Sequence, residues 1–176
     1  MNGALIILPM GFEEIEAVTP IDLLRRANVT VTVAALTYPV QVTGRSRLEL
    51  LTDSTLDSHL NEQFELVILP GGPGTENYFS SLILEQFLKS QKGYVAAICA
   101  APRVLYRYGM LRGKKYTCHP SVRGELKESL DEPVVVDGKI ITSTGAGTAF
   151  EFGLKLVELL EGKEKADEIA KATNFI

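Results

Sequence analysis

The fold is decided by the stretch Gly93-Tyr94-Val95-Ala96-Ala97-Ile98-Cys99-Ala100-Ala101-Pro102. Its first half predicts a buried strand, because aromatic and β-branched residues favour strands and the alanines leave room for helices on both faces. Its second half predicts the first turn of a helix, since proline is tolerated at that position. Cys99 therefore lies where a buried strand turns abruptly into a helix.

This segment alone leaves two interpretations of Cys99 open. In α/β enzymes a sharp strand-to-helix turn with small neighbours presents a nucleophile to a cleft. The start of a helix also favours the thiolate over the thiol. The alternative is a buried structural cysteine, which is the more frequent fate of a free thiol.

The composition predicts one globular domain, residues 1–176, with 45% hydrophobic and 23% charged residues. The net charge of −4 gives no reason to expect binding to nucleic acid or to an anionic membrane. Two cysteines are too few for a disulfide framework, which indicates a reducing compartment. No apolar run approaches the ~20 residues of a membrane span, and the N-terminal run lacks the pattern of a signal peptide. These features together predict a soluble, cytoplasmic protein.

Strand-like and helix-like segments alternate along most of the chain. Strands are expected at residues 4–8, 29–33, 64–69, 94–98 and 116–118, with hairpins at 39–50 and 133–142. Helices are expected at residues 13–27, 76–91, 122–130, 145–160 and 163–173, and from Pro102 onward. Pro20 is expected to break or kink the first helix near Thr19, and Gly162 to end the helix that precedes it. The alternation predicts an α/β sandwich with a mostly parallel sheet.

Chemically useful residues follow four of these strands, and ligands bind at the C-terminal edge of such sheets. The residues are the acids Glu13, Glu14 and Glu16, the pair Gly71-Gly72, Cys99, and His119. An acid, a glycine loop, a thiol and an imidazole are therefore expected at the same edge. No histidine or cysteine spacing indicates a metal site.

Each of these residues suggests a role beside a nucleophile. Taken alone, Gly71 and Gly72 indicate only a tight turn, but their N–H groups could join that of Ala100 in an oxyanion hole. His119 is a candidate general base or hydrogen-bond donor. Glu16, if it points into the cleft, should have a raised pKa and could donate a hydrogen bond to the Cys99 sulfur.

The sequence resembles the ThiJ/PfpI superfamily, in the branch of the parkinsonism-associated deglycase and its bacterial relatives. The resemblance rests on five motifs that occur in the family's order and span nearly the whole chain. They are residues 11–16 (GFEEIE), 69–72 (LPGG), 96–100 (AAICA), 117–120 (TCHP) and 147–152 (GTAFEF).

The resemblance implies a flavodoxin-like α/β sandwich that forms a homodimer and needs no cofactor. It places the family's reactive cysteine on Cys99, its protonated acid partner on Glu16, and its histidine on His119. It places the backbone donors on Gly71, Gly72 and Ala100. The sequence departs from the family pattern at Ala101, where glycine is frequent, and at Cys118, which is a candidate resolving thiol for Cys99 or simply a strand residue.

The resemblance implies several activities, which the residues do not favour equally. A glyoxalase or deglycase acting on methylglyoxal or glyoxal-derived adducts fits a Cys99 thiolate supported by Glu16. The partners would then be small reactive aldehydes or glycated adducts. A non-enzymatic oxidative-stress sensor or chaperone that uses oxidation of Cys99 is the alternative. A protease fits less well, because no acid in the sequence identifies itself as the partner that would orient His119.

Overall fold

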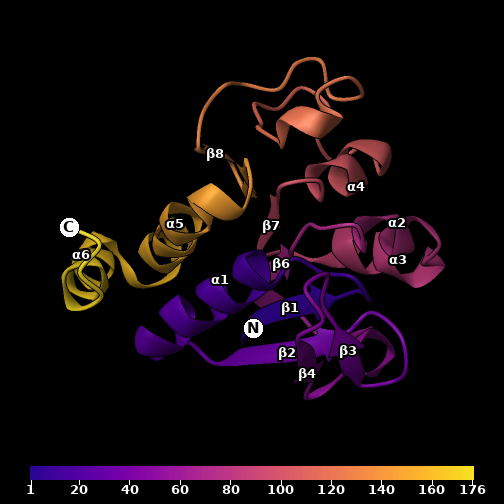
Figure 1. Ribbon diagram of the computed structural model, residues 1–176, viewed down its shortest axis with the longest axis horizontal. Helices are drawn as coiled ribbons and strands as arrows, with labels where there is room; N and C mark the ends of the chain where they lie inside the picture. The colour runs from indigo at the N-terminus through magenta and orange to yellow at the C-terminus, as the bar shows by residue number, and fades with distance from the viewer.

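The computed structural model describes residues 1–176 and is built around a seven-stranded sheet (Figure 1). The strand order is β5-β2-β1-β6-β7-β9-β8, and every neighbouring pair is parallel except β8 and β9. The strands of this sheet are β1 (Asn2–Leu8), β2 (Val31–Ala35), β5 (Ser54–Thr55), β6 (Phe64–Leu69), β7 (Tyr94–Ile98), β8 (Val134–Asp137) and β9 (Ile140–Ser143). A separate antiparallel hairpin consists of β3 (Gln41–Thr43) and β4 (Glu49–Leu51).

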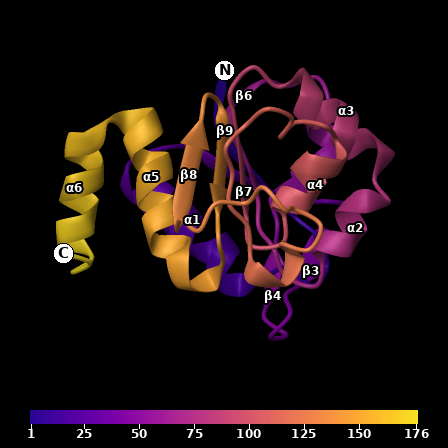
Figure 2. The same ribbon diagram turned by 90° about the horizontal axis from the view of Figure 1, so that it is seen from above.

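Helices cover both faces of the sheet, as Figures 1 and 2 show. One face carries α1 (Glu14–Arg26), α5 (Ala149–Glu161) and α6 (Lys163–Ala172); the other carries α2 (Thr75–Phe79), α3 (Leu82–Ser90) and α4 (Pro102–Arg107). Short 3₁₀ turns occur at Leu56–His59, Pro120–Val122 and Ala146–Thr148. None of the helices has both the length and the apolar character that crossing a membrane would require.

Strand β1 shows why its sequence is apolar at every position. Ala4, Ile6 and Leu8 belong to the core under α1 and α5, whereas Leu5 and Ile7 belong to the core under α2, α3 and α4. All five side chains are buried, so neither face of the strand has a polar position. This confirms the expected α/β sandwich with a mostly parallel sheet, and the arrangement is flavodoxin-like.

The order of the strands positions the functional site. From β1 the chain first adds β2 on one side and later adds β6 and β7 on the other. The strand order therefore reverses between β1 and β6, and the loops after these two strands diverge there. Ligands of open α/β sheets bind at such a reversal, outside the C-terminal ends of the strands. The loops after β1, β6 and β7 carry the acids, the glycines and Cys99, respectively.

Of the two outcomes expected at Pro20, a break or a kink in helix α1, the break is wrong. The helix is continuous from Glu14 to Arg26 with Pro20 buried inside it. Its packing against α5 is close: a Cβ placed on Gly153 would lie 3.4 Å from the Cα of Pro20 and 2.6 Å from a methyl of Leu23. Burial of this face against α5 stabilises the helix more than one missing backbone hydrogen bond weakens it.

The expected helix over residues 76–91 is two helices. Ser81 adopts an extended conformation between α2 and α3, and its hydroxyl accepts a hydrogen bond from the N–H of Leu84 at 3.4 Å. A serine in this position caps a new helix instead of continuing the old one.

Two further expectations are wrong, the strand at residues 116–118 and the helix at 122–130. The first segment bonds outside any ladder: the Thr117 N–H donates to the Thr142 hydroxyl at 2.9 Å, and the Tyr116 carbonyl accepts from the Leu130 N–H at 2.8 Å. Because the Leu130 N–H donates to Tyr116, it cannot make the backbone hydrogen bond of a helix. Gly124 also disfavours a helix in the residues before Leu130. Residues 120–122 form only a 3₁₀ turn, followed by turns.

Candidate active site

Cys99 lies in the turn between β7 and α4 with a φ of +66°, in the left-handed region that favours glycine. Both of its backbone polar groups are bound. Its N–H donates to the Ser143 carbonyl at 2.9 Å, and its carbonyl accepts from the His119 N–H at 2.9 Å. A non-glycine residue in this conformation costs about 1–3 kcal/mol and persists only where its surroundings fix it. The side chain is half-buried and its thiol is free.

Glu16 and the loop after β6 hold each other in place. The Glu16 side chain is 1% exposed, and its Oε2 accepts a hydrogen bond from the Gly71 N–H at 2.8 Å. In return, the Gly71 carbonyl accepts from the Glu13 N–H at 2.9 Å. The start of α1 is thus joined to the end of β6 across the point where the strand order reverses.

The backbone N–H groups of Gly72 and Ala100 lie close enough to the Cys99 sulfur to offset part of the rise in the pKa of its thiol. The Glu16 carboxyl lies beside the same sulfur. Gly71 was expected to be a third backbone donor near the sulfur, but its N–H donates to the Glu16 carboxyl. Gly71 thus acts on Glu16, and the role of these backbone N–H groups in an oxyanion hole stays a prediction.

Burial raises the pKa of the Glu16 carboxyl from its ordinary value of 4.5 to about 7. Burial also raises the pKa of the Cys99 thiol to about 12, and the ionised Glu16 carboxylate beside the sulfur adds to this effect. The direction is opposite to the one expected for a thiol at the start of a helix, because burial disfavours the charged thiolate and the neighbouring carboxylate adds to that effect.

Protonation of Glu16 reverses this effect on the sulfur. The negative charge beside Cys99 disappears, and the carboxyl O–H becomes a hydrogen-bond donor to the sulfur. A Cys99 thiolate is therefore supported by Glu16 only when that carboxyl is neutral.

His119 directly precedes the 3₁₀ turn at Pro120–Val122 and lines the same cleft as Cys99. Its Nδ1 accepts a hydrogen bond from the Ser121 N–H at 3.2 Å and lies 2.8 Å from the Ser121 hydroxyl. A backbone N–H can only donate, so Nδ1 is the acceptor and the neutral ring carries its proton on Nε2. No carboxylate bonds to this ring, as the absence of an obvious orienting acid in the sequence led us to expect.

Cys118 is fully buried in the core under α2, α3 and α4. Its sulfur donates a hydrogen bond to the Ser129 hydroxyl at 3.3 Å. Cys99 packs against the core on the other face of the sheet. Both cysteines are free thiols, and a resolving role for Cys118 stays a prediction.

The cleft around Cys99 has a volume of about 450 Å³ and brings together Glu16, Cys99, His119 and the two backbone donors, Gly72 and Ala100. It also contains five polar side chains that the sequence analysis missed: Arg45, Thr75, Glu76, Arg103 and Ser121. Arg103 could have been predicted near the cleft from its position, because it lies in the first turn of the helix, three residues after Ala100. No sequence pattern predicts Arg45; it reaches the cleft from the polar segment after β3 and pairs with Glu13 at 3.1 Å. No group of three or more His, Cys, Asp or Glu side chains is placed to hold a metal ion.

A protein-family model described as the DJ-1/PfpI family matches residues 2–159, which include every residue of this cleft. The chain belongs to the DJ-1/PfpI family. This agrees with the resemblance inferred from the five sequence motifs.

Three DJ-1 proteins illustrate how far the likeness extends. Protein dj-1beta of Drosophila melanogaster is 43% identical, over 97% of this chain and 95% of its own. Its crystal structure superimposes with a TM-score of 0.94 at 42% identity and covers 98% of this chain and 97% of that one. The Caenorhabditis elegans protein named glutathione-independent glyoxalase DJR-1.2 is 39% identical over 97% of this chain and 95% of its own. The structure of oxidized Toxoplasma gondii DJ-1 has a TM-score of 0.93 at 36% identity, covering 98% of each chain.

Replacement of Glu16 tests whether its protonated form stabilises the Cys99 thiolate. We expect Glu16→Leu to move the pH midpoint of Cys99 alkylation by iodoacetamide upward by about one to two pH units, the value of a lost hydrogen bond to a charged group. Glu16→Gln should move it less, because the amide N–H can still donate. Glu151→Leu, an exposed glutamate on α5, is the control. A downward shift in Glu16→Leu would mean that Glu16 is ionised when the thiol reacts, and an unchanged midpoint would exclude the hydrogen bond.

Replacement of Gly71 tests whether the Cys99–Glu16 contact needs a residue without a side chain. A Cβ at Gly71 would lie 2.6 Å from the Cys99 Cβ and 2.7 Å from the Glu16 Oε2. We expect Gly71→Ala to lower the free energy of unfolding by about 1–3 kcal/mol and to slow Cys99 alkylation at least about tenfold. Urea unfolding and the alkylation rate measure the two effects. Gly124→Ala, whose added methyl would meet no atom within 4 Å, is the matched control. Wild-type alkylation by Gly71→Ala would contradict this packing argument.

Proposed function

We propose that this protein is a cysteine-dependent, cofactor-independent glyoxalase or deglycase that acts on methylglyoxal or on glyoxal-derived adducts. The observation that carries the proposal is the Cys99 sulfur, which faces a buried carboxyl and two backbone N–H donors in one cleft. The name of the Caenorhabditis elegans relative, a glutathione-independent glyoxalase, supports the same activity. The homodimer inferred from the family resemblance remains part of the proposal.

The first step is addition of the Cys99 thiolate to the aldehyde carbon of methylglyoxal. A C–S bond forms, the C=O bond gives its electron pair to oxygen, and protonation yields a hemithioacetal. We assign stabilisation of the developing oxyanion to the N–H groups of Gly72 and Ala100, which lie near the sulfur. The neutral Glu16 carboxyl is placed to supply the proton.

The second step moves a proton from the former aldehyde carbon to the neighbouring carbonyl carbon. The first carbon is oxidised to a thioester and the second is reduced to an alcohol, so no external oxidant or reductant takes part. We assign this proton transfer to Glu16, with a pKa near 7, and to the imidazole of His119, which line the same cleft. Water then cleaves the thioester, which releases lactate and the Cys99 thiol.

The proposal predicts that the purified protein converts methylglyoxal to lactate without glutathione. Cys99→Ala and Cys99→Ser should each lose all measurable turnover, because no other side chain in the cleft can form the thioester. Cys118→Ser is the matched control and should keep turnover, since its sulfur is bound to Ser129 and lies in the other core. Lactate formation and methylglyoxal consumption are measured in parallel. Unchanged turnover in Cys99→Ala would refute the mechanism.

A second candidate function is peroxide sensing, in which Cys99 is oxidised to a sulfinate. The observation that favours it is the same accessible thiol beside a carboxyl that can donate to a new oxygen. The printed description of the Toxoplasma gondii DJ-1 structure as oxidized is consistent with such chemistry in the family.

The sensor function predicts that Cys99 is the first residue to gain oxygen during a peroxide titration. Intact-mass measurement with peptide mapping should find two added oxygens on Cys99 before any methionine is oxidised. A Cys99–Cys118 disulfide in the same titration would instead establish Cys118 as a resolving thiol. Oxidised methionines with Cys99 unchanged would count against the sensor function.

A further inference from the structure

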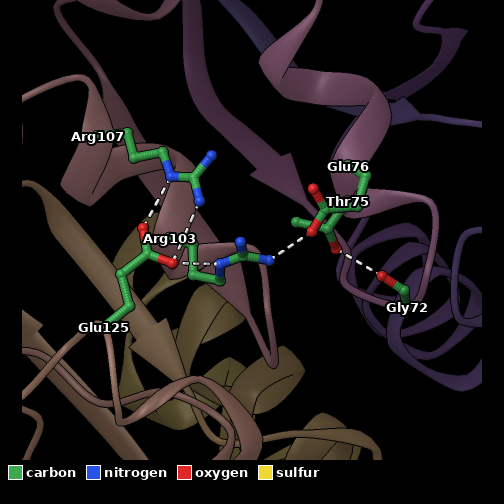
Figure 3. Close-up of polar contacts among 6 residues, drawn as sticks. All are labelled: Gly72, Thr75, Glu76, Arg103, Arg107 and Glu125. Atoms are coloured by element: carbon green, nitrogen blue, oxygen red, sulfur yellow. Dashed lines mark hydrogen bonds and ion pairs between the residues drawn. The ribbon is translucent and has the colours of Figure 1, made fainter.

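A network of ion pairs joins the two sides of the cleft outside the Cys99–Glu16 pair (Figure 3). Arg103 stands at its centre, with a side chain only 16% exposed. Its Nε donates to Oε2 of Glu125 at 2.8 Å, and its Nη1 donates to Oε1 of Glu76 at 2.6 Å. Arg107, one turn further along α4, donates from Nε to Oε1 of Glu125 at 2.7 Å. Both carboxylate oxygens of Glu125 are therefore occupied by arginines of α4.

The same two arginines hold the other end of the short helix α2. The guanidinium carbons of Arg103 and Arg107 lie 5.1 Å and 3.9 Å from the ring centroid of Phe79, the last residue of α2. These are cation–π distances. Because Glu76 lies in the first turn of α2 and Phe79 at its end, α4 contacts α2 at both ends.

Helix α2 in turn holds the glycine loop. The Thr75 hydroxyl donates to the Gly72 carbonyl at 2.6 Å, and the Thr75 N–H donates to the same oxygen at 3.1 Å (Figure 3). The Gly72 N–H is one of the two backbone donor groups that lie near the Cys99 sulfur. The other donor, Ala100, accepts at its carbonyl from the Arg103 N–H at 3.2 Å. The network therefore begins at one backbone donor and ends at the other.

We propose that Arg103 is a positioning residue that fixes the two backbone donors, Gly72 and Ala100, relative to each other at the Cys99 sulfur. Arg103 binds Glu76 and so holds helix α2, whose Thr75 binds the Gly72 carbonyl. Glu125 keeps the Arg103 guanidinium in place and is itself held by Arg107. Helix α2 has only five residues and would otherwise be weakly held. The catalytic role of the two donors rests on the function proposed above, whereas their geometry does not.

The charges of the network keep it intact at neutral pH. Its two arginines and two glutamates balance, and the Arg107 guanidinium, with that of Arg103, lowers the pKa of the Glu125 carboxyl. Glu125 therefore stays ionised over the whole pH range in which Glu16 and Cys99 titrate. The forked guanidinium of Arg103 reaches two carboxylates at once, which a lysine ammonium on its flexible stem reproduces only in part.

Glu125→Gln tests the proposal because Glu125 does not line the cleft and acts only through the arginines. We expect kcat for methylglyoxal to fall about tenfold with KM unchanged, less than the loss of about 10²–10³ from deleting a donor outright. The pH midpoint of Cys99 alkylation should rise, because displaced donors stabilise the thiolate less. Thermal stability should change little, since partly exposed ion pairs contribute little to the free energy of unfolding.

Arg103→Gln, Arg103→Lys and the double variant Arg103→Gln/Glu125→Gln complete the experiment. The double variant should be no slower than Arg103→Gln alone, because both changes break one network, and Arg103→Lys should be intermediate. Glu76→Gln breaks the other end and replaces Glu125→Gln if that variant fails to fold. Arg26→Gln, which breaks the exposed ion pair with Asp22 at 2.8 Å on α1, is the matched control and should behave as wild type.

Three outcomes would overturn the proposal: wild-type kcat and alkylation in Glu125→Gln, additive losses in the double variant, or an effect of Arg103→Gln on KM alone. The last would make Arg103 a substrate-binding residue. Cys99 alkylation by iodoacetamide needs no turnover of methylglyoxal. Absence of glyoxalase activity in the wild type would therefore refute the proposed function while the alkylation data still tested the network.

Discussion

The hydrogen bond from the Gly71 N–H to the Glu16 carboxyl is the contact on which the site depends. Glu16 is buried, and a buried carboxyl group is costly unless its oxygens are bonded. This bond satisfies Glu16 and ties the start of α1 to the end of β6. It also brings Glu16 to the Cys99 sulfur, because Gly71 has no side chain to keep the two apart. Loss of the contact would leave both a misplaced acid and an unsupported thiol.

The Glu16–Cys99 pair explains why two different functions fit one cleft. In the proposed chemistry the thiol proton of Cys99 passes to the Glu16 carboxylate, and the resulting thiolate is a nucleophile. An aldehyde and a peroxide both react with that thiolate, and the product of either reaction places an oxygen where Glu16 and the backbone donors can bind it. The chemistry at Cys99 is therefore selected by which reactive molecule reaches the cleft.

The sequence predicts much of the fold and the centre of the site because both depend on local patterns. Continuous apolar runs located β1, β6 and β7, and the rule that ligands bind at the strand ends collected Glu16, Gly71, Cys99 and His119 at one edge. The sequence did not predict which donor serves which acceptor, since one N–H of Gly71 can be used only once. It also did not predict the Arg103 network, whose partner Glu125 lies 22 residues away in a segment without regular structure. The continuity of α1 through Pro20 depended on packing against α5, which no local pattern contains.

The left-handed conformation of Cys99 sets chemistry and stability against each other at a single position. Glycine is the residue that this backbone accommodates without strain, and glycine is also the residue that has no sulfur. Selection for folding stability alone would therefore favour removal of the nucleophile, whereas selection for reactivity keeps it. The two backbone hydrogen bonds to Ser143 and His119 let the protein tolerate the less stable choice. Thermostabilising changes are consequently better sought in the flanking helices than at this turn.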